Sequence, residues 1–170
     1  MAKYQITYSC GHEATIQLFG KESDRQRKIE WLESEGLCPD CYKAKIAKEH
    51  AEASAKAYEA AKGMGMPELE GSEKQIAWAE TIRQKALDRD SVLARIMNMA
   101  NAIFADQAKK DIWQRMADKL EPVPKEKRTD ALYGWYLDTV KKQTSAHWWI
   151  ENRGDADYKL AVATIEAWQK

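Results

Sequence analysis

Cys10-Gly11-His12 and Cys38-Pro39-Asp40-Cys41 are two short stretches that each place two metal-ligating side chains within one tight turn. Together they contain all three cysteines of the 170-residue chain. An odd number of cysteines argues against a disulfide scaffold and favours metal ligation or isolated thiols. Thiolate and imidazole are ligands that Zn²⁺ prefers, and four of them complete a tetrahedral site. The sequence therefore predicts one zinc ion held by Cys10, His12, Cys38 and Cys41.

The identity of the fourth ligand is open between two histidines. His12 is the first choice, whereas His50 lies nine residues after Cys41 and would reach the metal only if the intervening helix bends or begins late. His147 is remote in the sequence and lies beside a tryptophan, which favours packing. Four protein ligands leave no open position for water, so the zinc is expected to be structural. The competing interpretation is three ordinary thiols.

Apolar residues alternate with polar ones on both sides of the first stretch. This period of two around a glycine predicts a β-hairpin over residues 3–19. Ser23 and Gln26 form a capping box that is expected to start a helix, and Gly36 is expected to end it. The ligand pair in the hairpin turn, Cys10 and His12, is followed by a second pair, Cys38 and Cys41, at the start of a helix. This order resembles a treble-clef or zinc-ribbon arrangement. The resemblance covers residues 3 to about 50 and departs from the usual Cys-x-x-Cys pattern at its first pair.

The remainder of the chain shows helical patterning. Residues 42–62, rich in Ala, Lys and Glu, predict an exposed helix, and Gly63-Met64-Gly65-Met66-Pro67 breaks it. Ser72 and Gln75 form a second capping box. Another helix is expected to start at Asp90 or Ser91, with a break near 106–110, and to end at Pro122 and Pro124. A further segment is expected to start at Thr129 or Asp130, followed by residues 145–152 with the adjacent tryptophans, and the last helix is expected to run from about Asp155 to Trp168.

These patterns predict an α+β fold that is mostly α. We expect a treble-clef-like zinc module of hairpin and helix at 1–50, a helical extension and hinge at 51–71, and a bundle of four or five helices at 72–170.

The charges of the chain cancel, with 27 basic and 27 acidic residues. The balance holds along the chain, at 10 against 10 in 1–66, 12 against 11 in 67–128 and 5 against 6 in 129–170, so no basic domain is hidden by an acidic tail. This disfavours general coating of nucleic acid. No apolar run has the roughly 20 residues that a bilayer span needs, and the first residues lack a signal-peptide core. We therefore expect a cytoplasmic protein without membrane partners.

No motif in the sequence supports catalysis. Zinc-dependent nucleobase deaminases need His-x-Glu and Pro-Cys-x-x-Cys, whereas here Glu13 directly follows His12 and Pro39 lies inside the cysteine pair. Gly63-Met64-Gly65 lacks the third glycine of a dinucleotide-binding loop and follows a helix instead of a strand. The expectation is a protein that is not an enzyme.

Candidate contacts with a partner or a nucleic acid are basic and aromatic side chains. Acidic neighbours dilute each basic group, which favours a solvated mixed-charge surface over a phosphate track. Adjacent tryptophans at 148 and 149 cannot both face one core if they are helical, so one is a candidate interface anchor, although burial of both between two helices is the favoured interpretation. The candidates are Arg25, Arg27, Lys28, Lys43, Lys45, Lys48, Trp148 and Trp149.

Four strings together resemble small proteins of phages and other mobile elements of gut Firmicutes: residues 8–12, residues 37–42, Ser72-Glu73-Lys74-Gln75-Ile76-Ala77-Trp78-Ala79, and Trp148-Trp149-Ile150-Glu151-Asn152-Arg153. Some such proteins are anti-CRISPR inhibitors, which bind a host nuclease or its nucleic-acid path. The resemblance implies a binding protein that inhibits a host defence nuclease such as Cas9, with that nuclease or its nucleoprotein complex as partner. The alternative is a zinc-containing accessory factor that binds DNA or RNA.

Overall fold

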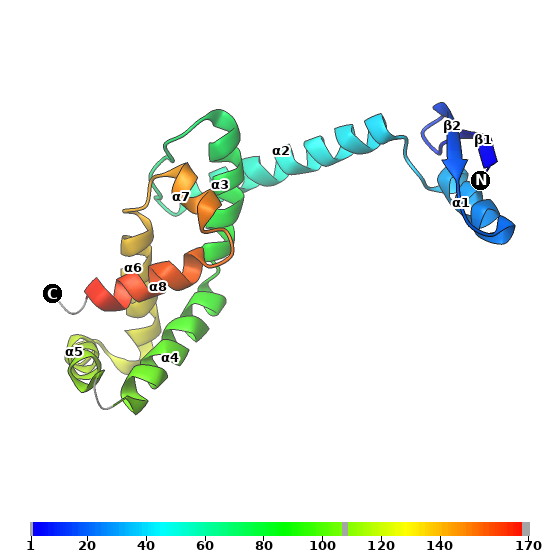
Figure 1. Ribbon diagram of the computed structural model, residues 1–170. Coiled ribbons are helices and arrows are strands. Elements are labelled where there is room, and N and C mark those ends of the chain that lie inside the picture. The colour runs from blue at the N-terminus through cyan, green and yellow to red at the C-terminus, as the bar shows by residue number, and fades with distance from the viewer. Residues whose placement is uncertain (1, 107–108, 168–170) are drawn as a thin grey trace. The chain divides into compact units, whose positions relative to one another are not determined.

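The computed structural model describes residues 2–106 and 109–167, and these form two compact units (Figure 1). The first unit spans Met1–Glu52 and the second Ala53–Lys170. The described residues are mostly helical and include one two-stranded antiparallel sheet, in agreement with the predicted α+β, mostly α class. Trp168, the expected end of the last helix, lies outside the described residues.

The first unit is built on the predicted hairpin. Strand β1 (Ala2–Thr7) pairs antiparallel with β2 (Glu13–Leu18), with Tyr4 opposite Ile16 and Ile6 opposite Ala14. Because side chains alternate along a strand, one face of this ribbon carries the apolar residues toward helix α1 (Glu22–Ser34). The resulting small core consists of Ile6, Tyr8, Ile29, Leu32 and Cys38.

The predicted capping box at Ser23 and Gln26 is wrong. Helix α1 begins at Glu22 with Lys21 as its N-cap, so Ser23 lies inside the first turn. The side chain of Arg25 ties the start of the helix to the hairpin: its Nη1 donates to the Gly20 carbonyl at 2.8 Å and its Nε donates to the Tyr4 hydroxyl at 2.9 Å. These contacts fix the connection from strand to helix.

Helix α2 (Pro39–Gly63) is continuous and runs from the first unit into the second (Figure 1). Pro39 occupies the first helical position, where its missing N–H costs nothing and its fixed φ suits the helix. Only Ala57 and Ala61, near the end of the helix, are buried. The predicted exposed helix is therefore confirmed, as is the break after Gly63.

The second unit contains helices α3 (Glu73–Ala86), α4 (Arg89–Ala105), α5 (Lys110–Leu120), α6 (Arg128–Val140), α7 (Ala146–Glu151) and α8 (Ala156–Glu166), with a 3₁₀ turn η2 at Lys125–Lys127. Helix α3 packs on α7, and α4 packs on α5, α6 and α8. Trp149, Tyr136 and Val140 are fully buried at the centre. The Tyr136 hydroxyl donates to the Ala86 carbonyl at 2.8 Å, so a residue of α6 satisfies the C-terminal end of α3.

The second predicted capping box is confirmed at the start of α3. The Ser72 hydroxyl accepts from the Gln75 backbone N–H, and the Gln75 side chain accepts in return from the Ser72 N–H at 3.0 Å. The start of α4 differs from prediction, because Asp88 and not Asp90 or Ser91 is the cap. Its carboxylate accepts the Ser91 N–H at 2.9 Å, and hydrogen bonding from the Ser91 side chain, followed by that from this N–H, lowers the pKa of Asp88.

The two serines give a direct test of which capping box is real. Replacing Ser72 by Ala should lower the free energy of unfolding of the second unit by about 1 kcal/mol, because one N–H of the first helical turn loses its acceptor. Replacing Ser23 by Ala should change the stability of the first unit by less than about 0.5 kcal/mol. Urea unfolding of each variant measures both values. A Ser23 variant that costs as much as the Ser72 variant would contradict the observed helix start.

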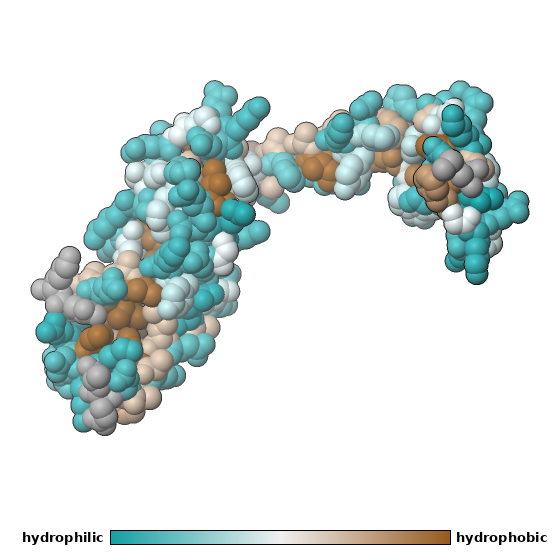
Figure 2. All heavy atoms as spheres, in the orientation of Figure 1, coloured by the Kyte–Doolittle hydropathy of each residue, from teal (hydrophilic) through white to brown (hydrophobic). Residues whose placement is uncertain are grey.

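Hydrophilic side chains cover most of the face seen in Figure 2. Within the described part of the chain, no helix combines the length and the apolar character that crossing a membrane requires.

Candidate metal centre

Two turns supply the four predicted ligands. Cys10 and His12 lie in the connection between β1 and β2, where Gly11 adopts a φ of 80° that side chains other than glycine rarely tolerate. The Gly11 N–H donates to the Tyr8 carbonyl at 2.8 Å, which closes this turn. The turn therefore directs both side chains from positions on either side of Gly11.

The second turn is held against the first by hydrogen bonds. The Ser9 N–H and hydroxyl both donate to the Gly36 carbonyl, at 3.1 and 3.0 Å. A Cβ on Gly36 would lie 2.7 Å from the Leu32 Cα, so only glycine fits this close approach. Cys38 then precedes α2, and Cys41 lies in the first turn of that helix. The two pairs of ligands are thus brought together by the chain itself.

The four ligand atoms converge on one point. The His12 Nδ1 lies 3.5 Å from the Cys10 Sγ, 3.6 Å from the Cys38 Sγ and 3.4 Å from the Cys41 Sγ. All four ligand atoms lie within 4.8 Å of one another. Cys38 is buried, the other two cysteines are half-buried and His12 is exposed. This cluster could hold one metal ion.

Backbone N–H groups point at two of the sulfur atoms. The Cys38 N–H donates to the Cys10 Sγ at 3.4 Å, and the Cys41 N–H donates to the Cys38 Sγ at 3.4 Å. The first of these, with a further hydrogen bond from His12, lowers the pKa of Cys10 to about 6. The hydrogen bond with Cys38, followed by burial, raises the pKa of Cys41 to about 11. A cation at the cluster would favour the thiolate form of each sulfur.

The other two histidines lie outside this cluster. His50 is exposed on α2, and it lies nine residues after Cys41, which corresponds to about 13 Å of helix. His147 on α7 pairs with Glu151, with 3.2 Å between Nε2 and Oε1. Of the two candidates for the fourth ligand, the structure therefore places His12 with the cysteines.

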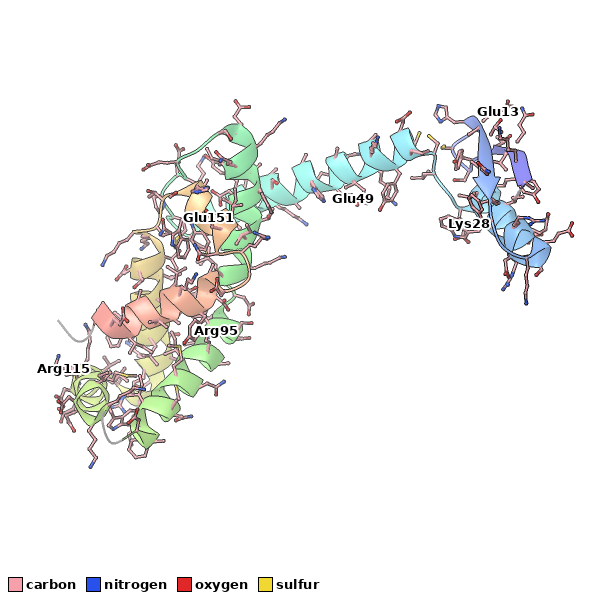
Figure 3. All side chains as sticks on the ribbon, in the orientation of Figure 1. Glu13, Lys28, Glu49, Arg95, Arg115 and Glu151 are labelled. Atoms are coloured by element: carbon pink, nitrogen blue, oxygen red, sulfur yellow. The ribbon has the colours of Figure 1, made fainter. Side chains whose placement is uncertain are left out.

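Most of the basic candidate residues of the first unit have acidic or aromatic neighbours. On α1, Arg27 pairs with Asp24 at 2.5 Å, and the Lys28 ammonium lies 4.1 Å from the centre of the Trp31 ring (Figure 3). On α2, Lys43 is exposed, and the pairs Lys45–Glu49 and Lys48–Glu52 are each separated by 3.9 Å. Arg25 makes the contacts with Tyr4 and Gly20 described above. The acidic neighbours expected from the sequence thus pair with three of these six residues.

The two adjacent tryptophans have different environments. Trp149 is fully buried, and its Nε1–H donates to the Gln143 carbonyl at 3.1 Å. Trp148 is half-buried, and its ring meets that of Trp149 edge-on with 5.3 Å between centroids. Trp149 is therefore a core residue, and Trp148 packs against the same core.

A buried ion pair in the second unit is not evident from the sequence. On α3, Arg83 donates from Nε and Nη2 to the two carboxylate oxygens of Glu80, at 3.1 and 2.6 Å, and from Nη1 to the Pro67 carbonyl at 2.7 Å. The side chains are 2% and 1% exposed. Burial raises the pKa of Glu80, and Arg83 opposes this effect. Their sequence spacing would equally suit an exposed pair, so only the fold identifies them.

Comparisons of the chain with protein-family models, with curated proteins and with solved structures found no match.

Proposed function

We propose that the chain is a non-enzymatic binding protein whose first unit is held by one structural zinc ion. The four converging ligand atoms of the Cys/His cluster carry the zinc part of this proposal. Zn–S bonds of about 2.3 Å and Zn–N bonds of about 2.0–2.1 Å separate N from S by about 3.5 Å in a tetrahedral site. The three separations from the His12 Nδ1 are 3.5, 3.6 and 3.4 Å. The donor set and its spacing thus fit zinc.

The same geometry favours a structural role over a catalytic one. Catalytic zinc sites use three protein ligands and leave a fourth position for water or substrate, whereas this cluster offers four. Bound zinc would join the hairpin turn, through Cys10 and His12, to the start of α2, through Cys38 and Cys41. This order of ligands is the treble-clef-like arrangement that the sequence resembles.

The partner that we propose is a host defence nuclease, with Cas9 as the first to test. The sequence resemblance carries this choice. The balance of charge in each segment of the chain supports recognition of a protein surface over coating of nucleic acid.

Inhibition of the nuclease is the direct test. A purified Cas9–guide RNA complex should lose DNA cleavage when the protein is added in equimolar amount, and the two should co-elute in size-exclusion chromatography after nuclease digestion of free nucleic acid. Full cleavage at a large molar excess of the protein would contradict this partner.

A second candidate is a factor that binds DNA or RNA, favoured by exposed aromatic rings in the first unit. Phe19, Trp31 and Tyr42 are 66%, 47% and 57% exposed, and such rings can stack on bases. If this function holds, log affinity for single-stranded DNA should fall steeply with log salt, with a slope of about −0.7 per phosphate contacted. Replacing Lys28 by Gln should reduce that slope, whereas replacing Lys56, which belongs to the second unit, should not. A flat salt response would exclude this candidate.

A further inference from the structure

The three sulfur atoms of the Cys/His cluster are not equivalent. Cys38 is buried, whereas Cys10 and Cys41 are half-buried. The Cys10 Sγ accepts the Cys38 N–H, and the Cys38 Sγ accepts the Cys41 N–H, each at 3.4 Å. Within residues 2–106 and 109–167, no backbone N–H donates to the Cys41 Sγ. Of the three cysteines, Cys41 therefore combines a partly exposed side chain with a sulfur that has no backbone donor.

Hydrogen bonds decide how reactive each sulfur is toward an electrophile. When they ligate zinc, all three sulfurs are thiolates, so their degree of protonation does not distinguish them. An N–H donor stabilises the negative charge of a thiolate, and a stabilised thiolate is a weaker nucleophile. Burial restricts access to Cys38, and Cys10 has a backbone donor. The Cys41 Sγ is thus expected to react fastest.

We propose that Cys41 is the cysteine that a peroxide modifies first, and that it then forms a disulfide with Cys38. This inference rests on the zinc centre proposed above. The Cys41 thiolate attacks one oxygen of hydrogen peroxide, so that an S–O bond forms, the O–O bond breaks and hydroxide leaves. The Cys38 thiolate then attacks the sulfur of this sulfenic acid, so that the S–S bond forms, the S–O bond breaks and a second hydroxide leaves. Two thiolates are oxidised by two electrons, and one peroxide is reduced.

The start of α2 brings Cys38 within reach of Cys41. The Tyr42 N–H donates to the Cys38 carbonyl at 2.8 Å, so residues 38–42 form one helical turn. Cα atoms three positions apart in such a turn are separated by about 5 Å, within the range of about 4.4–6.8 Å that disulfides span. Cys10 lies in the hairpin turn, so a disulfide with it would require one turn to move against the other. The disulfide would remove two of the four zinc ligands, and the first unit should lose its metal.

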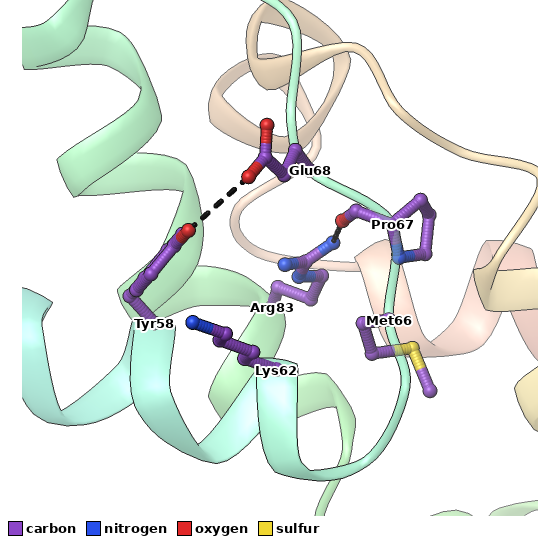
Figure 4. A pocket seen from close by; sticks show the side chains of 6 residues that line it. All are labelled: Tyr58, Lys62, Met66, Pro67, Glu68 and Arg83. Atoms are coloured by element: carbon purple, nitrogen blue, oxygen red, sulfur yellow. Dashed lines mark hydrogen bonds between the residues drawn. The ribbon is translucent and has the colours of Figure 1, made fainter.

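Methionines of the second unit serve as internal references, because residues 53–170 contain no cysteine. Met66 lines a hollow between the end of α2 and α3, together with Pro67 and Arg83, and is 8% exposed (Figure 4). Met97 on α4 is 48% exposed. Peroxide converts accessible methionine to its sulfoxide. Oxidation of Met97 therefore reports general exposure to peroxide, whereas oxidation of Met66 reports opening of the second unit.

Treatment of the full-length, zinc-containing protein with hydrogen peroxide in small molar excess tests the disulfide. Zinc release, followed with a zinc-binding dye, should reach one ion per chain, and peptide mapping by mass spectrometry should find Cys38 joined to Cys41. Cys10 should remain a thiol and Met66 unoxidised. A disulfide that includes Cys10, or oxidation of Met97 while the zinc and all three thiols are retained, would overturn the proposal.

Limited labelling of the same protein tests the order of reactivity without a variant that could fail to fold. With less than one equivalent of N-ethylmaleimide, Cys41 should carry at least about threefold more label than Cys10 or Cys38, since each of these sulfurs has a backbone donor. The three cysteines are one another's controls. Zinc-containing protein that is labelled first at Cys10 would contradict this inference alone, whereas protein that binds no zinc would also remove the centre on which it rests.

Discussion

Replacing Cys38 by Ser should unfold the first unit and leave the second unit folded. The Cys38 Sγ lies 3.6 Å from the His12 Nδ1 and accepts the Cys41 N–H, and the side chain belongs to the small hydrophobic core. Units of this size often need a metal to fold, and structural zinc contributes an apparent 10–16 kcal/mol in zinc-finger peptides, which is about as much as a typical domain's whole stability. The stability lost with one zinc ligand should therefore be larger than the total stability of the first unit.

The ¹⁵N–¹H NMR spectrum of the full-length Cys38→Ser protein shows both outcomes at once. Amide signals of residues 2–52 should collapse to the narrow range of an unfolded chain, whereas signals of 53–167 should keep their positions. His50→Ala is the matched control, because His50 is a histidine of the same unit that lies outside the cluster, and its spectrum should stay native. A dispersed spectrum for Cys38→Ser would show that the cluster does not hold the unit.

The second large effect is expected at the buried ion pair of α3. Arg83→Met leaves the Glu80 carboxylate buried without its partner, which should lower the free energy of unfolding of the second unit by about 3–5 kcal/mol at pH 7. Lys141→Met removes an exposed pair with Asp138, of the same i,i+3 spacing, and should cost less than about 1 kcal/mol. Urea unfolding followed by tryptophan fluorescence measures both.

The loss of unfolding free energy caused by Arg83→Met should depend on pH. Burial raises the pKa of Glu80, and Arg83 is the group that lowers it, so removal of Arg83 raises that pKa further. The folded variant then binds a proton at a higher pH than the unfolded chain does. Its destabilisation should consequently shrink as the pH falls from 7 toward the ordinary pKa of a glutamate and grow as the pH rises through the raised value. A loss that is equal at pH 5 and pH 7 would show that Glu80 is not an uncompensated buried charge.

A double variant separates this explanation from a simple packing defect. Adding Glu80→Leu to Arg83→Met removes the buried carboxylate, so part of the lost stability should return and the pH dependence should disappear. If the double variant is less stable than the single one at pH 7, the defect lies in packing around Arg83.

The structural features that depend only on residues close together in the sequence could be predicted. The hairpin follows from alternation around Gly11, and the cap at Ser72 follows from its spacing to Gln75. The ligand set was predictable for the same reason, because each turn places its two donors by local geometry. Only the choice between His12 and His50 needed the structure, which shows how far along α2 the second histidine lies.

Features that depend on contacts distant in sequence could not be predicted. Ser23 and Gln26 have the same spacing as the true box, yet α1 starts earlier, where Arg25 contacts Tyr4 and Gly20. The buried state of Glu80 depends on Arg83 and on how the segment containing Pro67 covers α3. In both cases the structure depends on a contact with a residue that lies more than a dozen positions away in the sequence.

The metal content of the purified full-length protein tests the central claim most directly. Protein prepared without chelator and analysed by inductively coupled plasma mass spectrometry should contain one zinc ion per chain, and the Cys38→Ser variant should contain almost none. A wild-type protein that carries no zinc, and binds none when Zn²⁺ is added to its reduced form, would contradict the zinc-held first unit.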